Sequence, residues 1–174
     1  MKLQEIRTRT AYEPNALPTQ KAAVRAWLGG MSGEFPLSLT LTLKQTIVEV
    51  NDKGTYKRKL TRIDCERIAK RFTQKLDREI FGKRKAGREG HRLKYLTVVE
   101  GERSNKNLHL HFAIGNLPNH VKLNQFDTLV TKAKIQVESI DVQHKVSIAS
   151  SGWMEYITKE VGAKDTDNVL WTLA

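Results

Sequence analysis

The chain has 174 residues, which is long enough for one domain with a hydrophobic core of its own. Thirty Lys and Arg against nineteen Asp and Glu give a net charge of +11, which favours nucleic acid over a membrane as the partner. The single cysteine excludes an internal disulfide, no apolar run is long enough to cross a membrane, and the first residues lack the apolar core of a secretory signal. We therefore expect a cytoplasmic protein.

Residues 1–34 are expected to form a peripheral extension, with a short helical pattern from Thr19 to Leu28 that stops at a Gly-Gly pair. Residues 35–174 are expected to form the single globular domain. Its first strand is predicted from Phe35 to Leu43, where leucine alternates with hydroxyl residues. The following segment predicts a hairpin that turns at Asp52-Lys53-Gly54.

Two long helices are predicted from their caps and apolar stripes. Thr61, followed three residues later by Asp64, is typical of a helix start, and the apolar stripe of that helix continues to about Ile80. Asn124 can cap a second helix. The stripe of the second helix consists of Phe126, Leu129, Val130, Ala133 and Val137.

A basic segment follows the first of these helices. Residues 81–95 hold six cations against one acid, Glu89, and three glycines that would keep the segment flexible. A flexible basic segment can follow a phosphate backbone, although a solvated loop without a partner has the same composition. The expected DNA-binding residues are Lys83, Arg84, Lys85, Arg88, Arg92 and Lys94.

Two histidines and a carboxylate are predicted to lie together on neighbouring strands. Alternation along a strand sends His109 and His111 to one face, while Leu110 between them faces the other way. Glu100 ends the preceding apolar run, and the turn-like residues 101–107 would bring it beside the histidines. Two imidazoles and a carboxylate can hold a divalent ion with open positions for a substrate oxygen, although a solvated strand face can carry the same residues.

The order of the elements predicts the fold class. A last strand is expected from Ile140 to Ile148, and a short helix from Trp153 to about Val161. Strand, helix, strand, strand, helix, strand and helix in this order favour an α+β fold. We expect an antiparallel sheet of about five strands with the helices packed on one face, of the ferredoxin or RNA-recognition type. The other face would be free and would carry the histidines.

Tyr156 and Lys159 lie one helical turn apart and therefore share a face of the short helix. A tyrosine hydroxyl is a poor nucleophile at neutral pH, but a nearby divalent cation and a lysine can help it attack phosphorus. Taken alone, such a pair is more often an amphipathic face residue and its solvated neighbour.

Together these motifs resemble the HUH endonucleases, specifically the single-tyrosine rolling-circle replication initiators. The resemblance extends over residues 35–160 and depends on the order and spacing of the motifs. The residues that carry it are Phe35 to Leu43, Glu100, His109, Leu110, His111, Tyr156 and Lys159. The implied activity is the nicking and joining of single-stranded DNA to start rolling-circle replication.

The resemblance also implies a site and a cofactor. The histidines and an acid would hold Mg²⁺ or Mn²⁺, which polarises the scissile phosphate. Tyr156 would attack, leaving a 5′-phosphotyrosyl link and a free 3′-hydroxyl, while Lys159 would orient the phosphate or stabilise charge. Glu100 is favoured as the third ligand because it stands nine residues before the first histidine. Glu160 is the alternative, as in related transposases, and Glu102 is a more distant one.

Expected partners are single-stranded DNA or an origin hairpin, and a separate helicase, since the chain has no phosphate-loop motif. The compartment would be the cytoplasm of a bacterial or archaeal cell, or of the host of a plasmid or phage. Two alternatives stay open: a DNA-binding transcriptional regulator with vestigial catalysis, and a related single-strand transposase or relaxase. An RNA-binding domain of similar topology is disfavoured, because the central strands lack aromatic residues for base stacking.

Overall fold

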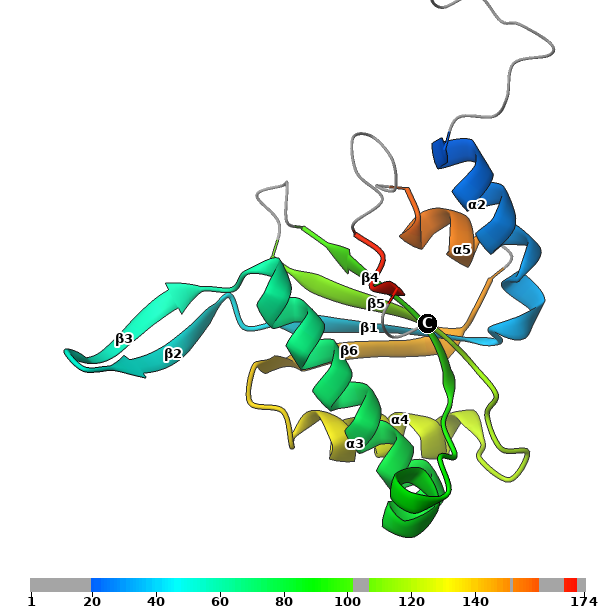
Figure 1. Ribbon diagram of the computed structural model, residues 1–174. Coiled ribbons are helices and arrows are strands. Elements are labelled where there is room, and N and C mark those ends of the chain that lie inside the picture. The colour runs from blue at the N-terminus through cyan, green and yellow to red at the C-terminus, as the bar shows by residue number, and fades with distance from the viewer. Residues whose placement is uncertain (1–19, 102–106, 151, 160–167, 172–174) are drawn as a thin grey trace, which may run out of the picture.

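A computed structural model describes residues 20–101, 107–150, 152–159 and 168–171 (Figure 1). Its main sheet is antiparallel, with the strand order β4-β5-β1-β6. The strands of this sheet are β1 (Leu37–Leu43), β4 (Lys94–Glu100), β5 (His109–Gly115) and β6 (Ile140–Ile148). The predicted α+β class is confirmed. β1 begins two residues later than expected, since Pro36 has no N–H to donate to the ladder.

The predicted hairpin forms a sheet of its own. β2 (Thr46–Asn51) and β3 (Gly54–Lys59) pair with each other across the expected turn and project from one end of the main sheet (Figure 1). The main sheet therefore has four strands, and the expectation of about five holds only if the hairpin is counted separately.

The two long helices cover one face of the main sheet, as predicted (Figure 1). α3 (Arg62–Arg88) begins at the expected capping box, in which the Thr61 side chain accepts from the Asp64 N–H and the Asp64 carboxylate accepts from the Thr61 N–H. Against these helices the strands turn their large apolar side chains. The most deeply buried are Leu39, Leu41, Phe72, Leu76, Leu110, Phe112, Ile114, Phe126 and Val130.

Two details of the helices differ from the prediction. α3 does not stop near Ile80 but continues to Arg88, bending at Gly82, whose φ of 82° is open to glycine without strain. α4 (Leu123–Lys134) is capped at Lys122 and not at Asn124, because the Gln125 side chain reaches back to the Lys122 N–H. Within the described residues no helix is both long and apolar enough to cross a membrane.

The second face of the sheet is only half free, so the expectation of a free face was wrong for its other half. α2 (Gln20–Gly30), the 3₁₀ turn η1 (Ser32–Glu34) and α5 (Trp153–Ile157) lie on this side (Figure 1). Strands β4 and β5 point apolar side chains toward them, and an apolar face needs a cover. The resulting second core contains Leu28, Phe35, Leu96, Val98, Ala113, Met154, Ile157 and Val169.

Candidate active site

The candidate site forms where β4, β5 and β1 lie side by side on the half-covered face. In the register of these strands His109 pairs with Glu100 on one side, and His111 pairs with Thr40 on the other. The two imidazoles share a face, with their ring centroids 6.2 Å apart. The predicted placement of Glu100 beside the histidines, on the side away from α3 and α4, is therefore confirmed.

His111 is fixed by hydrogen bonds at both ring nitrogens. Nε2 lies 2.6 Å from Glu100 Oε2, and Nδ1 lies 2.9 Å from Thr40 Oγ1. The His111 side chain is 5 % exposed, and this burial lowers its pKa below the ordinary value although the Glu100 hydrogen bond works in the other direction. The imidazole is therefore neutral at pH 7. It donates from Nε2 to the carboxylate and accepts at Nδ1 from the threonine hydroxyl.

Glu100 also carries an ion pair with Lys159. The Lys159 Nζ lies 2.7 Å from Glu100 Oε1, so the two carboxylate oxygens have different partners. Burial alone would raise the pKa of Glu100, but the hydrogen bonds from Lys159 and His111 outweigh it and hold the pKa below its ordinary value. Burial likewise works against the charge of Lys159, yet bonds to Glu100 and Tyr156 raise the pKa of Lys159. Carboxylate and ammonium are both charged at neutral pH.

Tyr156 on α5 stands above this charged pair. Its ring meets the ring of His111 edge-on at a centroid distance of 5.8 Å and stacks on Trp153 at 5.5 Å. The Lys159 Nζ lies 3.9 Å from the centroid of the same ring. The residue is 47 % exposed, so a ligand can reach it. Tyr156 and Lys159 do share a face, as predicted, and that face is turned toward His111 and Glu100.

These side chains line a cavity of about 540 Å³. It is bounded by Ser38, Thr40, Glu100, His109, His111, Lys145, Ser147, Ser150, Trp153 and Tyr156. Sequence reasoning did not select Thr40, Lys145 or Trp153 for this site. For Thr40 and Lys145 the signal was present, because strand alternation places them on the histidine face. For Trp153 the signal was its position one turn before Tyr156.

The donor types in this cavity fit a divalent cation, although the site has not formed as a ligand cluster. Within the described part of the chain no three His, Cys, Asp or Glu side chains stand in the arrangement of a metal site, since His111 and Glu100 are bonded to each other. The Thr40 hydroxyl can accept as well as donate. It therefore allows His111 to move its proton to Nδ1 and offer the Nε2 lone pair instead. The alternative ligands Glu160 and Glu102 lie outside the described residues.

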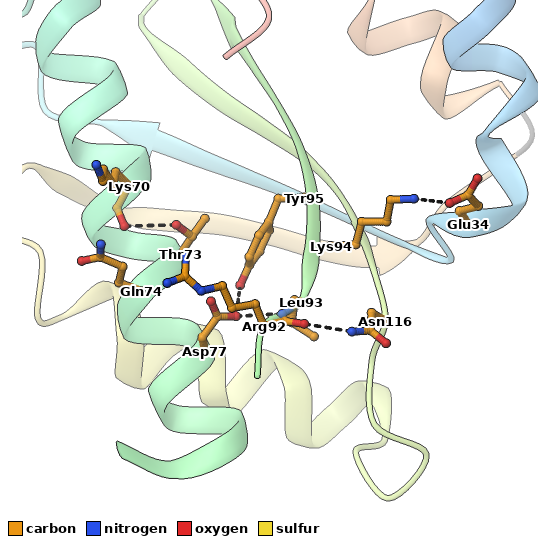
Figure 2. A pocket seen from close by; sticks show the side chains of 10 residues that line it. All are labelled: Glu34, Lys70, Thr73, Gln74, Asp77, Arg92, Leu93, Lys94, Tyr95 and Asn116. Atoms are coloured by element: carbon orange, nitrogen blue, oxygen red, sulfur yellow. Dashed lines mark hydrogen bonds and ion pairs between the residues drawn. The ribbon is translucent and has the colours of Figure 1, made fainter. Parts of the chain in front are cut away.

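The predicted DNA-binding residues lie away from this cavity. The first four continue α3 beyond its bend, so the expected flexible loop is helical as far as Arg88. Lys94 begins β4 and Glu100 ends it, a separation of about 20 Å along the strand. Arg92 and Lys94 instead line a second cavity of about 750 Å³, shown in Figure 2, where Lys94 pairs with Glu34.

Inside this second cavity Asp77 accepts from the Tyr95 hydroxyl at 2.8 Å and from the Leu93 N–H at 3.0 Å (Figure 2). Burial raises the pKa of the Asp77 carboxyl. These bonds tie the start of β4 to α3. The cavity is therefore part of the packing between helix and sheet, with cations only at its rim.

Fold and cavity together define an α+β domain with a charged, tyrosine-bearing site on one sheet face. The family model described as replication-associated protein ORF2 matches residues 36–162, which span β1 to Lys159 and cover well over half of the chain. The chain belongs to this family of replication-associated proteins. No curated protein and no solved structure matches it.

Proposed function

We propose that the chain is an HUH-type endonuclease that nicks and rejoins single-stranded DNA to initiate rolling-circle replication, with Tyr156 as the nucleophile. The observation that carries the proposal is the meeting of three distant segments in one cavity. An exposed tyrosine ring touches the buried His111, and Lys159 lies between that ring and Glu100. Membership of a replication-associated family supports the biological setting.

The side chains divide the reaction as follows. The Tyr156 oxygen attacks the scissile phosphorus, the bond from phosphorus to the 3′ oxygen breaks, and a 5′-phosphotyrosine and a free 3′-hydroxyl result. The tyrosine proton leaves to solvent, and the departing oxygen takes one up. Lys159, whose raised pKa keeps it charged, stabilises the negative charge that develops on the phenolic oxygen. Because the phosphodiester energy stays in the link, the reverse attack rejoins strands.

Glu100, His109 and His111 are the residues that would hold Mg²⁺ or Mn²⁺, which supplies Lewis-acid polarisation of the scissile phosphate. The choice of Glu100 over Glu160 is open to a direct test. Glu100→Gln should abolish the metal dependence of nicking, and Glu160→Gln should leave it in place. The opposite pattern would transfer the ligand role to Glu160.

The proposed nucleophile is tested by the covalent link that it leaves. A library of single-stranded oligonucleotides incubated with the protein and Mn²⁺ should yield a protein–DNA adduct that survives denaturation. Tyr156→Phe should form no adduct and still bind DNA, because the ring contacts remain. Tyr56→Phe is the matched control, since it removes an exposed hydroxyl from the hairpin, where Tyr56 donates to Glu49.

Undiminished adduct in Tyr156→Phe would contradict the assignment. DNA binding without any adduct in the unmodified chain would favour the transcriptional regulator with vestigial catalysis. If nicking is specific for a transposon end, the chemistry would stand but the role would be that of a transposase. Unwinding is assigned to a separate helicase, whose addition should extend replication from the nick.

A further inference from the structure

The β2-β3 hairpin has two unlike faces. Residues opposite each other in an antiparallel pair share a face, and the register pairs Val48 with Lys57 and Val50 with Thr55. Val48 is 58 % exposed and Val50 78 % exposed. The side chains of this valine–lysine face are Thr46, Val48, Val50, Thr55, Lys57 and Lys59, and all of them are exposed.

The opposite face anchors the hairpin to the rest of the fold. Arg58 bonds to Glu49 at 2.6 Å and to both oxygens of Asp64, at 2.6 and 2.9 Å, so the hairpin is tied to the first turn of α3. The Tyr56 hydroxyl donates to Glu49 at 2.7 Å. A pair of strands on its own is marginally stable in water, and these bonds hold it in a defined direction.

Charge separates the two faces. The carboxylates of Glu49 and Asp64 lie on the anchoring side, where Arg58 neutralises them. The valine–lysine face lies wholly within the described residues and carries no carboxylate, while Lys57 and Lys59 add two positive charges. An uncovered face with cations around two valines is complementary to an anionic partner that has an apolar element of its own.

The base of the hairpin connects this face to the candidate active site. The Gln45 side chain accepts from the Leu108 N–H at 3.0 Å, and the Leu43 N–H donates to the Leu108 carbonyl at 3.0 Å. Leu108 is the residue before His109. A ligand lying along the hairpin would therefore end beside the strand that carries the histidines.

We propose that the valine–lysine face inserts into the major groove of duplex DNA that flanks the single strand to be cut. The major groove is about 12 Å wide and admits a two-stranded ribbon, and six residues of strand span roughly 20 Å. Lys57 and Lys59 would contact phosphates, and Val48 and Val50 would meet the groove floor, where thymine methyl groups offer an apolar surface. The inference rests on the proposed function for the identity of the neighbouring single strand.

The first test measures the affinity of the full chain for a duplex of about two helical turns and for one of its strands alone, by fluorescence anisotropy. Lys57→Gln/Lys59→Gln should lower the slope of log affinity against log salt by about 1.8 for the duplex, since each phosphate contact contributes about 0.9. From about 50 to 200 mM salt the unmodified chain should then lose about 12-fold more affinity than the variant. Single-strand affinity should stay within about twofold.

The matched control is Lys122→Gln/Lys132→Gln, which removes the same charge at exposed positions of α4 and its cap. It should leave the duplex slope unchanged. An equal drop in both double variants, or a drop in single-strand affinity as large as that for the duplex, would overturn the proposal, because the lysines would then act only through net charge or on the single strand.

The groove itself is read by dimethyl sulfate, which methylates guanine N7 in the major groove and adenine N3 in the minor groove. We expect protection of N7 that disappears in Val48→Ser/Val50→Ser; protection of N3 alone would overturn the inference. Loss of self-association in that variant with unchanged duplex binding would assign the face to a second copy of the chain and also overturn it. Tyr156→Phe should bind the duplex normally, so failure of the nuclease proposal and of this one can be told apart.

Discussion

The ion pair between Lys159 and Glu100 makes the most direct prediction from the site. Lys159→Met removes the ammonium group and keeps a side chain of similar length. The 2.7 Å contact to Oε1 is lost from a carboxylate whose side chain is only 9 % exposed, while the His111 bond to Oε2 remains. The variant should be less stable than the unmodified chain, and the loss should depend on whether Glu100 is ionised.

The size of the loss follows from the exposure of the two partners. Breaking a fully buried pair costs about 3 to 5 kcal/mol, whereas exposed pairs are worth about 0 to 1 kcal/mol. The Lys159 side chain is 34 % exposed, so solvent screens part of the interaction and we expect a loss of about 1 to 2 kcal/mol. For a chain of this length that corresponds to a fall in Tm of roughly 2 to 8 °C.

The pH dependence has a fixed sign. The folded-state pKa of Glu100 lies below its ordinary value of 4.5, so its contribution is present above that pH and is lost as the pH falls through the folded pKa. Urea unfolding in the presence of a chelator should therefore show the full difference at about pH 7 and a much smaller one near pH 3. Lys145→Met, an exposed lysine of the same cavity, is the control and should change stability by less than about 0.5 kcal/mol. A difference that is equal at both pH values would refute the reasoning.

Three further substitutions test the supports of the site and of the sheet. Thr40→Val leaves Nδ1 of the buried His111 without its hydrogen-bond partner and should cost about 1 to 3 kcal/mol in urea unfolding; an unchanged midpoint would contradict the bond. Burial raises the pKa of Asp77, so ionisation works against folding, and Asp77→Asn should gain stability relative to the unmodified chain as the pH rises from acid to neutral; a falling difference would be the wrong sign. Gly101→Ala, with φ at 101° and its new Cβ 2.5 Å from a backbone carbonyl, should cost more than about 2 kcal/mol, whereas Gly90→Ala, in open space at φ 73°, should cost about 1 to 2 kcal/mol in thermal unfolding.

Periodicity and capping predicted most of the fold, because those signals are local. The alternation in β1 and β6, the capping box at Thr61 and the hairpin turn each depend on residues close in sequence, and the structure confirms them. The end of α3 could not be predicted in the same way. Glycines in a basic segment indicate a flexible loop, yet the helix bends at Gly82 and continues, with Ala86 buried on its far side.

The candidate site shows the same division. That Glu100, His109 and His111 share a face follows from strand alternation, and the one-turn spacing of Tyr156 and Lys159 follows from helical periodicity. What joins the two sets is tertiary: the packing of α5 on the sheet decides that Lys159 reaches Glu100. Nothing local in the sequence indicates that contact, or that Thr40 would hold the other side of the His111 ring.

The way the second face is covered also restricts how DNA can approach. β4, the edge strand beside the site, is bound by the segment around Val169, with Val99 N–H donating to Asn168 and Leu170 N–H to Thr97. α2 and α5 lie over β4 and β5, so this side is closed within the described part of the chain. The half formed by β1 and β6 turns Ser38, Thr40, Lys145 and Ser147 toward the cavity, and these hydroxyls and the lysine suit a phosphate backbone more than stacked bases. A single strand would therefore reach Tyr156 across β6 and β1, from the side of the sheet that the helices leave open.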